Sequence, residues 1–241
     1  MSEFFDNLFS KEILTMDWSA MDCNPFTIPE RLIGTNHDKA IRLVNGMILK
    51  YGLLIPILKP GAEILDMCCG SGFGSNFLSR SGFKVDGIDR NEKAIKVAQL
   101  RTNENLVFKR GNIFKEPIAK KYDAVILVDA IEHFYQKDQL FILKKCYDWL
   151  KPGGWFLIDT PLSKESKRES RHHLWVLNWK DFGELFCLSG NYTDISRYSV
   201  GCFKEKHSFI IRSDVDPGEY LHTDQIILGQ RRKINGTNFN S

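Results

Sequence analysis

Apolar and polar positions along the chain predict strands and helices in strict alternation. Short apolar runs are typical of buried strands, and they occur at 63–67, 84–89, 106–111, 124–130 and 155–159. Helical spacing or helix-capping residues occur between them, at 35–51, 74–82, 91–102, 140–150 and 178–190. We therefore predict an α/β fold, doubly wound and Rossmann-like, whose mostly parallel, seven-stranded sheet carries helices on both faces.

Two further strand-like runs, at 193–200 and 208–213, flank a turn-rich segment. They predict a C-terminal antiparallel strand pair that closes one edge of the sheet. The pattern divides the chain into a lid of short helices at 1–34, a main domain at 35–215 and a partly flexible C-terminal extension at 216–241.

The amino-acid composition gives little information about which molecules the protein binds. The 241 residues carry 33 basic and 30 acidic side chains, a formal charge of +3 that is too mild to indicate a nucleic-acid or membrane partner. No apolar run reaches the roughly 20 residues that cross a bilayer, and the acidic N-terminus is unlike a secretory signal. The six cysteines form neither a disulfide framework nor a zinc motif, so we expect reduced thiols and a cytoplasmic location.

The stretch "ILDMCCGSGFG", residues 64–74, carries the most information about function. Gly70, Gly72 and Gly74 would let the first strand-to-helix turn bend sharply and let a ligand approach the backbone. The third glycine comes one place too early for the dinucleotide fingerprint. Asp66, at the end of the strand, suits a positively charged ligand, whereas Asp89, at the end of the next strand, is placed to accept ribose hydroxyls.

Several linked motifs then resemble one family. "EILDMCCGSGFGSNFLSRSGFKVDGIDRNEKAIKVA", "YDAVILVDAIEHF" and "LKPGGWFLIDTP" are similar, in order and spacing, to motifs of class I S-adenosylmethionine-dependent methyltransferases. The resemblance covers roughly residues 35–212. It implies that the chain binds S-adenosyl-L-methionine and transfers its methyl group to an acceptor.

The resemblance also implies cofactor-binding residues. The glycines would pack under the methionine and ribose portions, Asp89 would hold the ribose, and Asn112 and Ile113 would lie beside the adenine, although Asn112 departs from the common aspartate. The complete predicted set is Asp66, Cys68, Gly70, Gly72, Asp89, Arg90, Asn112, Ile113, Val128 and Asp129.

Methyl transfer to oxygen or nitrogen needs close positioning and a group that removes the acceptor's proton. His133, just past the fourth strand, is the first candidate for that group. The charged segment 164–175 follows the fifth strand, where members of the family bind their acceptors, and it offers His172 and His173. We expect a small-molecule or glycan-type acceptor, and the basic residues of this segment suit an anionic one.

Other interpretations remain open. Glu132 and His133 with a downstream histidine loosely resemble the metal cluster of small-RNA 3′-terminal 2′-O-methyltransferases. That cluster has glutamate where this chain has Asp129, and the downstream histidine fits poorly by spacing, so we assign no metal ligand. An RNA methyltransferase, a catalytically silent cofactor-binding scaffold and a nicotinamide dehydrogenase are the alternative functions. The sequence does not indicate an oligomeric state.

Overall fold

The computed structural model describes residues 46–202, 209–212 and 223–233. The predicted lid at 1–34 and the first turns of the helix predicted from Thr35 lie outside these residues, and residues 46–52 are helical. The strands are β1 (Glu63–Met67), β2 (Lys84–Asp89), β3 (Leu106–Arg110), β4 (Tyr122–Val128), β5 (Leu150–Pro161), β6 (Tyr192–Cys202), β7 (Phe209–Arg212) and β8 (Thr223–Arg231). The helices are α5 (Phe73–Arg80), α6 (Glu92–Gln99), η1 (Ile131–His133), α7 (Gln136–Trp149) and α8 (Trp179–Ser189).

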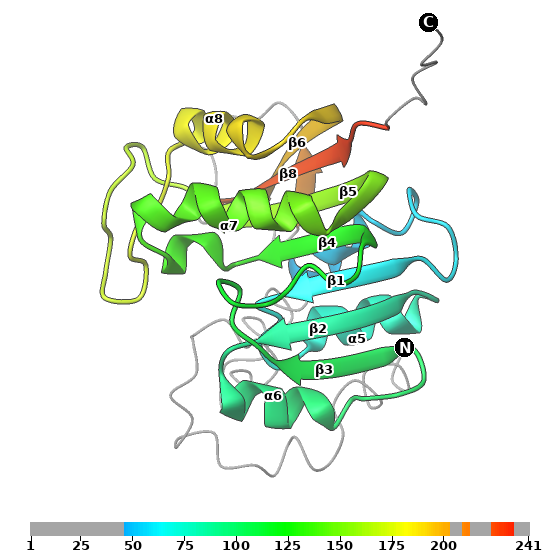
Figure 1. The fold of residues 1–241 in the computed structure, drawn as a ribbon. Helices are drawn as coiled ribbons and strands as arrows, with labels where there is room; N and C mark the ends of the chain where they lie inside the picture. The colour runs from blue at the N-terminus through cyan, green and yellow to red at the C-terminus, as the bar shows by residue number, and fades with distance from the viewer. Residues whose placement is uncertain (1–45, 203–208, 213–222, 234–241) are drawn as a thin grey trace, which may run out of the picture.

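The described strands form one sheet in the order β3-β2-β1-β4-β5-β8-β6-β7. The first five are mutually parallel, and the pairs β5–β8, β8–β6 and β6–β7 are antiparallel. Figure 1 shows α7 in front of β4, whereas α5 lies behind the sheet. The predicted Rossmann-like sheet with helices on both faces and antiparallel strands at one edge is confirmed.

Side-chain alternation along the strands creates a hydrophobic core on each face of the sheet. In β4, Ala124, Ile126 and Val128 belong to the core that packs under the helix at 46–52, α5 and α6. Val125 and Leu127 belong to the opposite core, under α7 and α8. Because both faces are covered, a central strand needs an almost continuous apolar sequence, and this is the pattern from which the strand was predicted.

Two helix starts follow the predicted capping chemistry. The Asn91 side chain accepts hydrogen bonds from the backbone N–H groups of Lys93 and Ala94 at the start of α6. The Asn178 side chain accepts one from the N–H of Asp181 at the start of α8. Each cap satisfies donors that a helix cannot satisfy internally, which explains why these helices begin where the sequence predicts.

The C-terminal region differs from the prediction. The sheet has eight strands over the described residues rather than seven, because β8 forms from residues that were placed in the extension at 216–241. It lies between β5 and β6, so the expected antiparallel pair, β6 and β7, is joined to the parallel strands through it. Ile226 and Leu228 enter one core and Ile227 enters the other. A run of only three apolar residues at 226–228 was too short to indicate a strand buried on both faces.

The four cysteines whose side chains the structure describes, Cys68, Cys69, Cys146 and Cys187, are free thiols, in agreement with the expectation for this part of the chain. Among the helices in the described residues, none has the length and apolar character needed to cross a membrane.

The position of β8 gives a stability prediction. Ile227 is fully buried, so Ile227→Ala removes packed side-chain volume and should lower the free energy of unfolding by about 2–4 kcal/mol. Ile195 in β6 is 41% exposed, so Ile195→Ala serves as the control and should cost less than about 1 kcal/mol. Urea denaturation measures both variants. Equal, small effects would mean that β8 is not a core strand.

Candidate functional site

A pocket of about 380 Å³ lies where the carboxyl ends of the parallel strands meet. The chain reverses direction across the sheet between β1 and β4, and such a point is where ligands bind in open α/β sheets. Eight of the ten predicted cofactor residues line it: Cys68, Gly70, Asp89, Arg90, Asn112, Ile113, Val128 and Asp129. The structure therefore brings together residues that span about sixty positions of the sequence.

Asp89 connects the two turns on one side of the pocket. One carboxylate oxygen accepts a hydrogen bond from the backbone N–H of Gly70 at 2.9 Å, and the other accepts one from the N–H of Asn91 at 2.7 Å. Burial raises the pKa of Asp89, and the hydrogen bonds to Asn91 and Gly70 oppose that rise. Each carboxylate oxygen has a second lone pair, so Asp89 can still accept two hydroxyl groups of a ligand.

Gly72 does not line the pocket, contrary to the expectation that it packs under the cofactor. Its φ of 80° is left-handed, and a Cβ built on it would lie 2.3 Å from the Phe108 ring. The glycine is required by backbone conformation and by packing against β3, at the start of α5. Gly70 also has a left-handed φ, of 55°, and it does line the pocket.

Asp66 also lies outside the pocket lining, although the sequence placed it beside the ligand's ammonium group. Its side chain is buried behind the glycine turn. There it accepts a hydrogen bond from Ser75 Oγ at 2.6 Å, and Tyr51 Oη lies 3.4 Å from both carboxylate oxygens. Burial raises the pKa of Asp66 to about 7, and the hydrogen bonds from Ser75 and Tyr51 act against this rise. Asp66 thus fixes the turn from behind.

Asn112 and Ile113 form the pocket wall after β3. Asn112 Oδ1 accepts a hydrogen bond from the backbone N–H of Phe114 at 3.0 Å, which holds the amide in place at the pocket. Ile113 is buried and offers an apolar surface. The apolar Ile113 side chain can cover a flat ring, and the Asn112 amide oxygen has a second lone pair that can accept a hydrogen bond from an amino group on that ring. Arg90 lines the neighbouring wall.

Sequence reasoning missed a buried charge cluster beside the pocket. Lys50 Nζ lies 3.0 Å from an Asp129 carboxylate oxygen and 2.6 Å from one of Asp159, and all three side chains are at most 9% exposed. Asp129, which follows β4, also has a left-handed φ of 48°. The aspartate in the otherwise apolar run "WFLID" was the available signal. The cluster ties the helix at 46–52 to the carboxyl ends of β4 and β5.

The three predicted catalytic histidines lie at the other side of the pocket. His133 and His172 line it, and His133 Nδ1 lies 2.8 Å from the backbone oxygen of His172. His173 is not in the lining, but its ring packs edge-on against His133 with 5.2 Å between centroids. Burial lowers the pKa of His133, although the hydrogen bond to His172 opposes this effect. A neutral His133 imidazole has one unprotonated ring nitrogen, as a proton acceptor requires.

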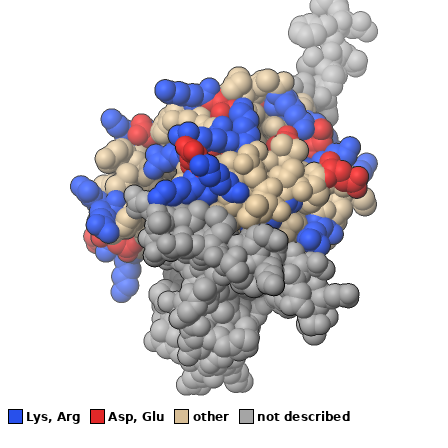
Figure 2. Space-filling model, turned by 90° about the horizontal axis from the view of Figure 1, so that it is seen from below, with Lys and Arg blue, Asp and Glu red and all other residues tan. Residues whose placement is uncertain are grey.

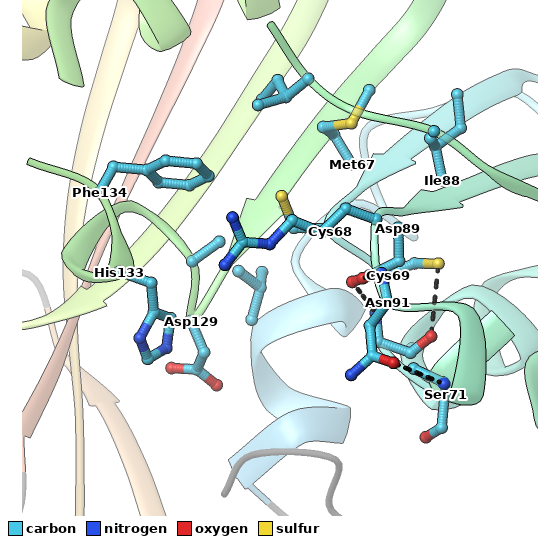
Figure 3. Close-up of a pocket in the computed structure, with 18 of the residues that line it drawn as sticks. Met67, Cys68, Cys69, Ser71, Ile88, Asp89, Asn91, Asp129, His133 and Phe134 are labelled. Atoms are coloured by element: carbon cyan, nitrogen blue, oxygen red, sulfur yellow. Dashed lines mark hydrogen bonds between the residues drawn. The ribbon is translucent and has the colours of Figure 1, made fainter. Parts of the chain in front are cut away.

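The pocket therefore has two chemically distinct ends. Figure 3 shows Asp89, Asn91 and Ser71 gathered at one end and Asp129, His133 and Phe134 at the other, with Cys68 between them. From the charged segment at 164–175, Arg171, His172 and Leu174 reach the lining, but Lys164, Lys167 and Arg168 do not. One end can hold a nucleoside, and the other is open to a second molecule.

Comparison with known proteins agrees with this geometry. Residues 40–189, more than half of the chain, match the family described as "Methyltransferase domain". The chain belongs to this family. The expected membership of the class I S-adenosylmethionine-dependent methyltransferases is thereby confirmed.

Individual methyltransferases show partial similarity. A ubiquinone biosynthesis O-methyltransferase of Nitrosospira multiformis is 35% identical over 105 residues, which are 42% of this chain and 43% of that protein. The chain thus spans about half the length of the curated relatives it matches.

Solved methyltransferase structures share the fold at low sequence identity. A SAM-dependent methyltransferase from Archaeoglobus fulgidus has a TM-score of 0.60 at 18% identity, covering 77% of this chain and 94% of its own. The Burkholderia thailandensis 1,6-didemethyltoxoflavin-N1-methyltransferase, crystallised with bound 1,6-didemethyltoxoflavin and S-adenosylhomocysteine, has a TM-score of 0.59 at 16% identity, covering 78% of this chain and 79% of its own.

Asp66 gives a prediction for the pH dependence of stability. In the unfolded chain its carboxyl ionises near pH 4, whereas in the folded protein it ionises at about 7. Between these values the unfolded state releases a proton that the folded state retains, so this group's contribution to stability falls as the pH rises. Relative to Asp66→Asn, the parent should lose about 2–4 kcal/mol of unfolding free energy between pH 4 and pH 8.

Urea denaturation of both proteins at the two pH values tests this prediction. Asparagine keeps an acceptor for Ser75 and Tyr51, so the variant should fold. Parallel pH profiles for parent and variant would show that Asp66 is not the buried, proton-retaining group described above.

Proposed function

We propose that this protein transfers the methyl group of S-adenosylmethionine to a hydroxyl oxygen of a small, largely apolar molecule. The observation that carries the proposal is the two-ended pocket, with an aspartate fixed for a ribose at one end and a histidine at the other. S-adenosylmethionine supplies a methyl group made electrophilic by the positively charged sulfur. The chain must hold the donor, place the acceptor in line with it and handle the acceptor's proton.

The residues present fit the nucleoside end of the cofactor. Asp89 is fixed by two backbone amides and has acceptor capacity for both ribose hydroxyls, while Ile113 and the Asn112 amide suit the adenine ring. Gly70, in the turn after β1, adds a position without a side chain to the lining. Asp89 contributes a negative charge at this end, whereas Asp129, at the other end of the pocket, is paired with Lys50.

The other end supports a hydroxyl acceptor with an apolar body. Phe134 and Leu174 contribute apolar surface there, and Phe134 packs edge-on against Phe114 at 5.8 Å. This apolar surface suits an acceptor with an apolar body, and Arg171, also in the lining, suits an acidic substituent. The name of the Nitrosospira relative, an O-methyltransferase, supports oxygen as the methylated atom.

The described surface favours a small acceptor over a nucleic acid. Figure 2 views the molecule from below Figure 1, and red Asp and Glu side chains stand among the blue Lys and Arg. Several basic side chains are paired, as where Glu92 contacts both Lys96 and Arg110. The pairing of these basic side chains supports a small acceptor over a nucleic acid, whose interfaces typically carry a basic stripe.

A labelling experiment tests the proposed reaction. The protein is incubated with methyl-labelled S-adenosylmethionine and a panel of phenolic, catecholic, aliphatic hydroxyl, amine, sugar and RNA acceptors. We expect label in an oxygen-methylated phenolic or catecholic product. Label only in RNA or in an amine would overturn the acceptor class, and an absence of label from the whole panel with intact nucleoside binding would favour a silent scaffold.

Asp89 should determine nucleoside affinity. Asp89→Asn removes the negative charge and leaves only one acceptor oxygen, so affinity for S-adenosylhomocysteine should fall about 10- to 100-fold. The matched control is Asp86→Asn on the same strand, where the carboxylate is 37% exposed and pairs with Lys120. That variant should bind like the parent. Calorimetric titration measures all three, and equal affinities would remove Asp89 from the site.

His133 should affect turnover and not nucleoside binding. His133→Ala should lower kcat about 10²- to 10⁴-fold, because the acceptor's proton loses its nearest handling group, while S-adenosylhomocysteine affinity stays the same. Tyr135→Ala is the control, since this residue is 56% exposed and absent from the lining. Steady-state kinetics with a labelled acceptor provide the readout. Unchanged kcat in His133→Ala would exclude its role.

A further inference from the structure

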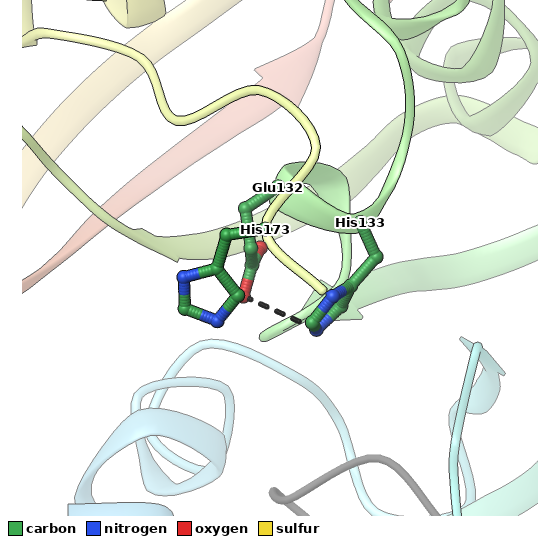
Figure 4. A group of neighbouring side chains, drawn as sticks. All are labelled: Glu132, His133 and His173. Atoms are coloured by element: carbon green, nitrogen blue, oxygen red, sulfur yellow. Dashed lines mark ion pairs between the residues drawn. The ribbon is translucent and has the colours of Figure 1, made fainter. Parts of the chain in front are cut away.

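Three possible metal-ligating side chains converge at the acceptor end of the pocket. One ligand atom each from Glu132, His133 and His173 lies within 4.8 Å of the others. Figure 4 shows Glu132 and His133 coming from the turn after β4 and His173 from the segment after β5. The sequence analysis assigned no metal ligand, because Asp129 stands where the known cluster has glutamate and because the spacing of the downstream histidine looked unsuitable. The fold removes the second objection by placing His173 against His133.

Hydrogen bonds to neighbouring groups orient the side chains of Glu132 and His133. Glu132 Oε2 accepts a hydrogen bond from Thr160 Oγ1 at 3.0 Å. His133 Nδ1 lies 2.8 Å from the His172 backbone oxygen, and since a carbonyl oxygen can only accept, Nδ1 must carry the proton. The lone pair of the neutral His133 ring is therefore on Nε2, which lies 3.7 Å from Glu132 Oε1.

His173 is oriented in the same way. Its Nδ1 lies 2.9 Å from Glu169 Oε2, so the carboxylate accepts the Nδ1 proton and the lone pair of the neutral ring is on Nε2. Metal-ligating histidines in proteins almost always donate their other N–H to a carboxylate or a backbone carbonyl. His133 shows the carbonyl form of this arrangement and His173 the carboxylate form.

Burial and position also suit a reactive metal centre. The Glu132 side chain is fully buried, and those of His133 and His173 are 16% and 17% exposed. His133 lines the pocket, so the cluster borders the space that the acceptor would fill. Two histidines and one carboxylate form a three-donor set that leaves coordination positions for water or substrate, as in catalytic zinc sites.

We propose that Glu132, His133 and His173 bind a divalent transition-metal ion, with zinc the best match to the donor set, and that its open positions face the acceptor. The Nε2 atoms of both histidines and the Oε1 atom of Glu132 are the ligands. Thr160, Glu169 and the His172 carbonyl hold these ligands in orientation.

The role of the ion rests on the proposed function. A cation next to an acceptor hydroxyl lowers the pKa of that hydroxyl and orients its oxygen. In the step we propose, the O–H bond breaks and its proton passes to water. The oxygen electron pair forms the new bond to the methyl carbon, and the pair of the broken carbon–sulfur bond returns to sulfur. In this step His133 holds the metal ion that lowers the pKa of the hydroxyl and does not itself take the proton. No atom is oxidised or reduced.

Metal titration tests the site without any need for catalysis. The untagged full chain is stripped with a chelator, dialysed and titrated calorimetrically with Zn²⁺, and with Co²⁺ to follow visible absorption. We expect one ion per chain. Glu132→Gln and His173→Ala should each lower the affinity at least about 100-fold, and Glu169→Gln about 10-fold.

The control variant is His172→Ala. It keeps the backbone carbonyl that orients His133 and removes an imidazole that is not part of the cluster, so it should bind the ion like the parent. Circular dichroism confirms that each variant folds. Absence of stoichiometric binding, or binding that Glu132→Gln and His173→Ala leave unchanged, would overturn the proposal.

Two readouts separate this proposal from the proposed function. S-adenosylhomocysteine binding in excess chelator reports the nucleoside site alone and should persist. Stoichiometric metal binding with no methyl transfer to any acceptor would support the site and contradict the proposed function. Methyl transfer at the parent rate in excess chelator would overturn the catalytic role of the ion.

Discussion

The Asp89 carboxylate is the interaction on which the geometry of the pocket depends. It lies at the end of β2 and accepts hydrogen bonds from the backbone of the β1–α5 turn and of the α6 cap. Without it, Gly70 and Asn91 would lose a shared acceptor, and the two turns would not be held at a fixed separation. The same carboxylate retains lone pairs that face the pocket. The Asp89 carboxylate thus holds the two turns of the site together and can also bind the ligand. Its partial burial is unfavourable for a charged group, as the raised pKa indicates.

Several unfavourable features of this structure lie at the carboxyl ends of the parallel strands. Left-handed backbone at Cys68 and Asp129, the raised pKa of Asp66 and the buried Lys50–Asp129–Asp159 cluster all occur at the carboxyl ends of β1, β4 and β5. Each opposes folding or offsets another unfavourable group. The two apolar cores on the faces of the sheet supply the stability that tolerates them. A stable apolar core combined with strained turns at the strand ends is expected where a rigid sheet holds a ligand-binding site.

Most of the fold could be predicted from the sequence, because apolar strands, capping asparagines and glycine turns are local signals. Asn91 and Asn178 cap the helices predicted at 91–102 and 178–190. Strands β1 to β4 lie within two residues of their predicted bounds, whereas β5 begins five residues before the predicted run at 155–159. β8 was missed because its burial depends on β5 and β6, which flank it in space but not in sequence. Gly72 and Asp66 were assigned contacts with the ligand. Gly72 instead packs against Phe108 and Asp66 contacts Tyr51, and the local sequence did not indicate these contacts because the two partners are distant along the chain. His173 was rejected as a metal ligand because of its distance from His133 in the sequence. Its distance from His133 in space is instead set by the path of the segment after β5.

The central claim is that a nucleoside occupies the pocket with its ribose on Asp89, and a crystal structure of the complex with S-adenosylhomocysteine tests it most directly. The account predicts both ribose hydroxyls within hydrogen-bonding distance of the Asp89 carboxylate, the adenine against Ile113 and the sulfur directed toward His133. A nucleoside bound elsewhere, or turned so that its adenine lies at the histidine end, would contradict the account.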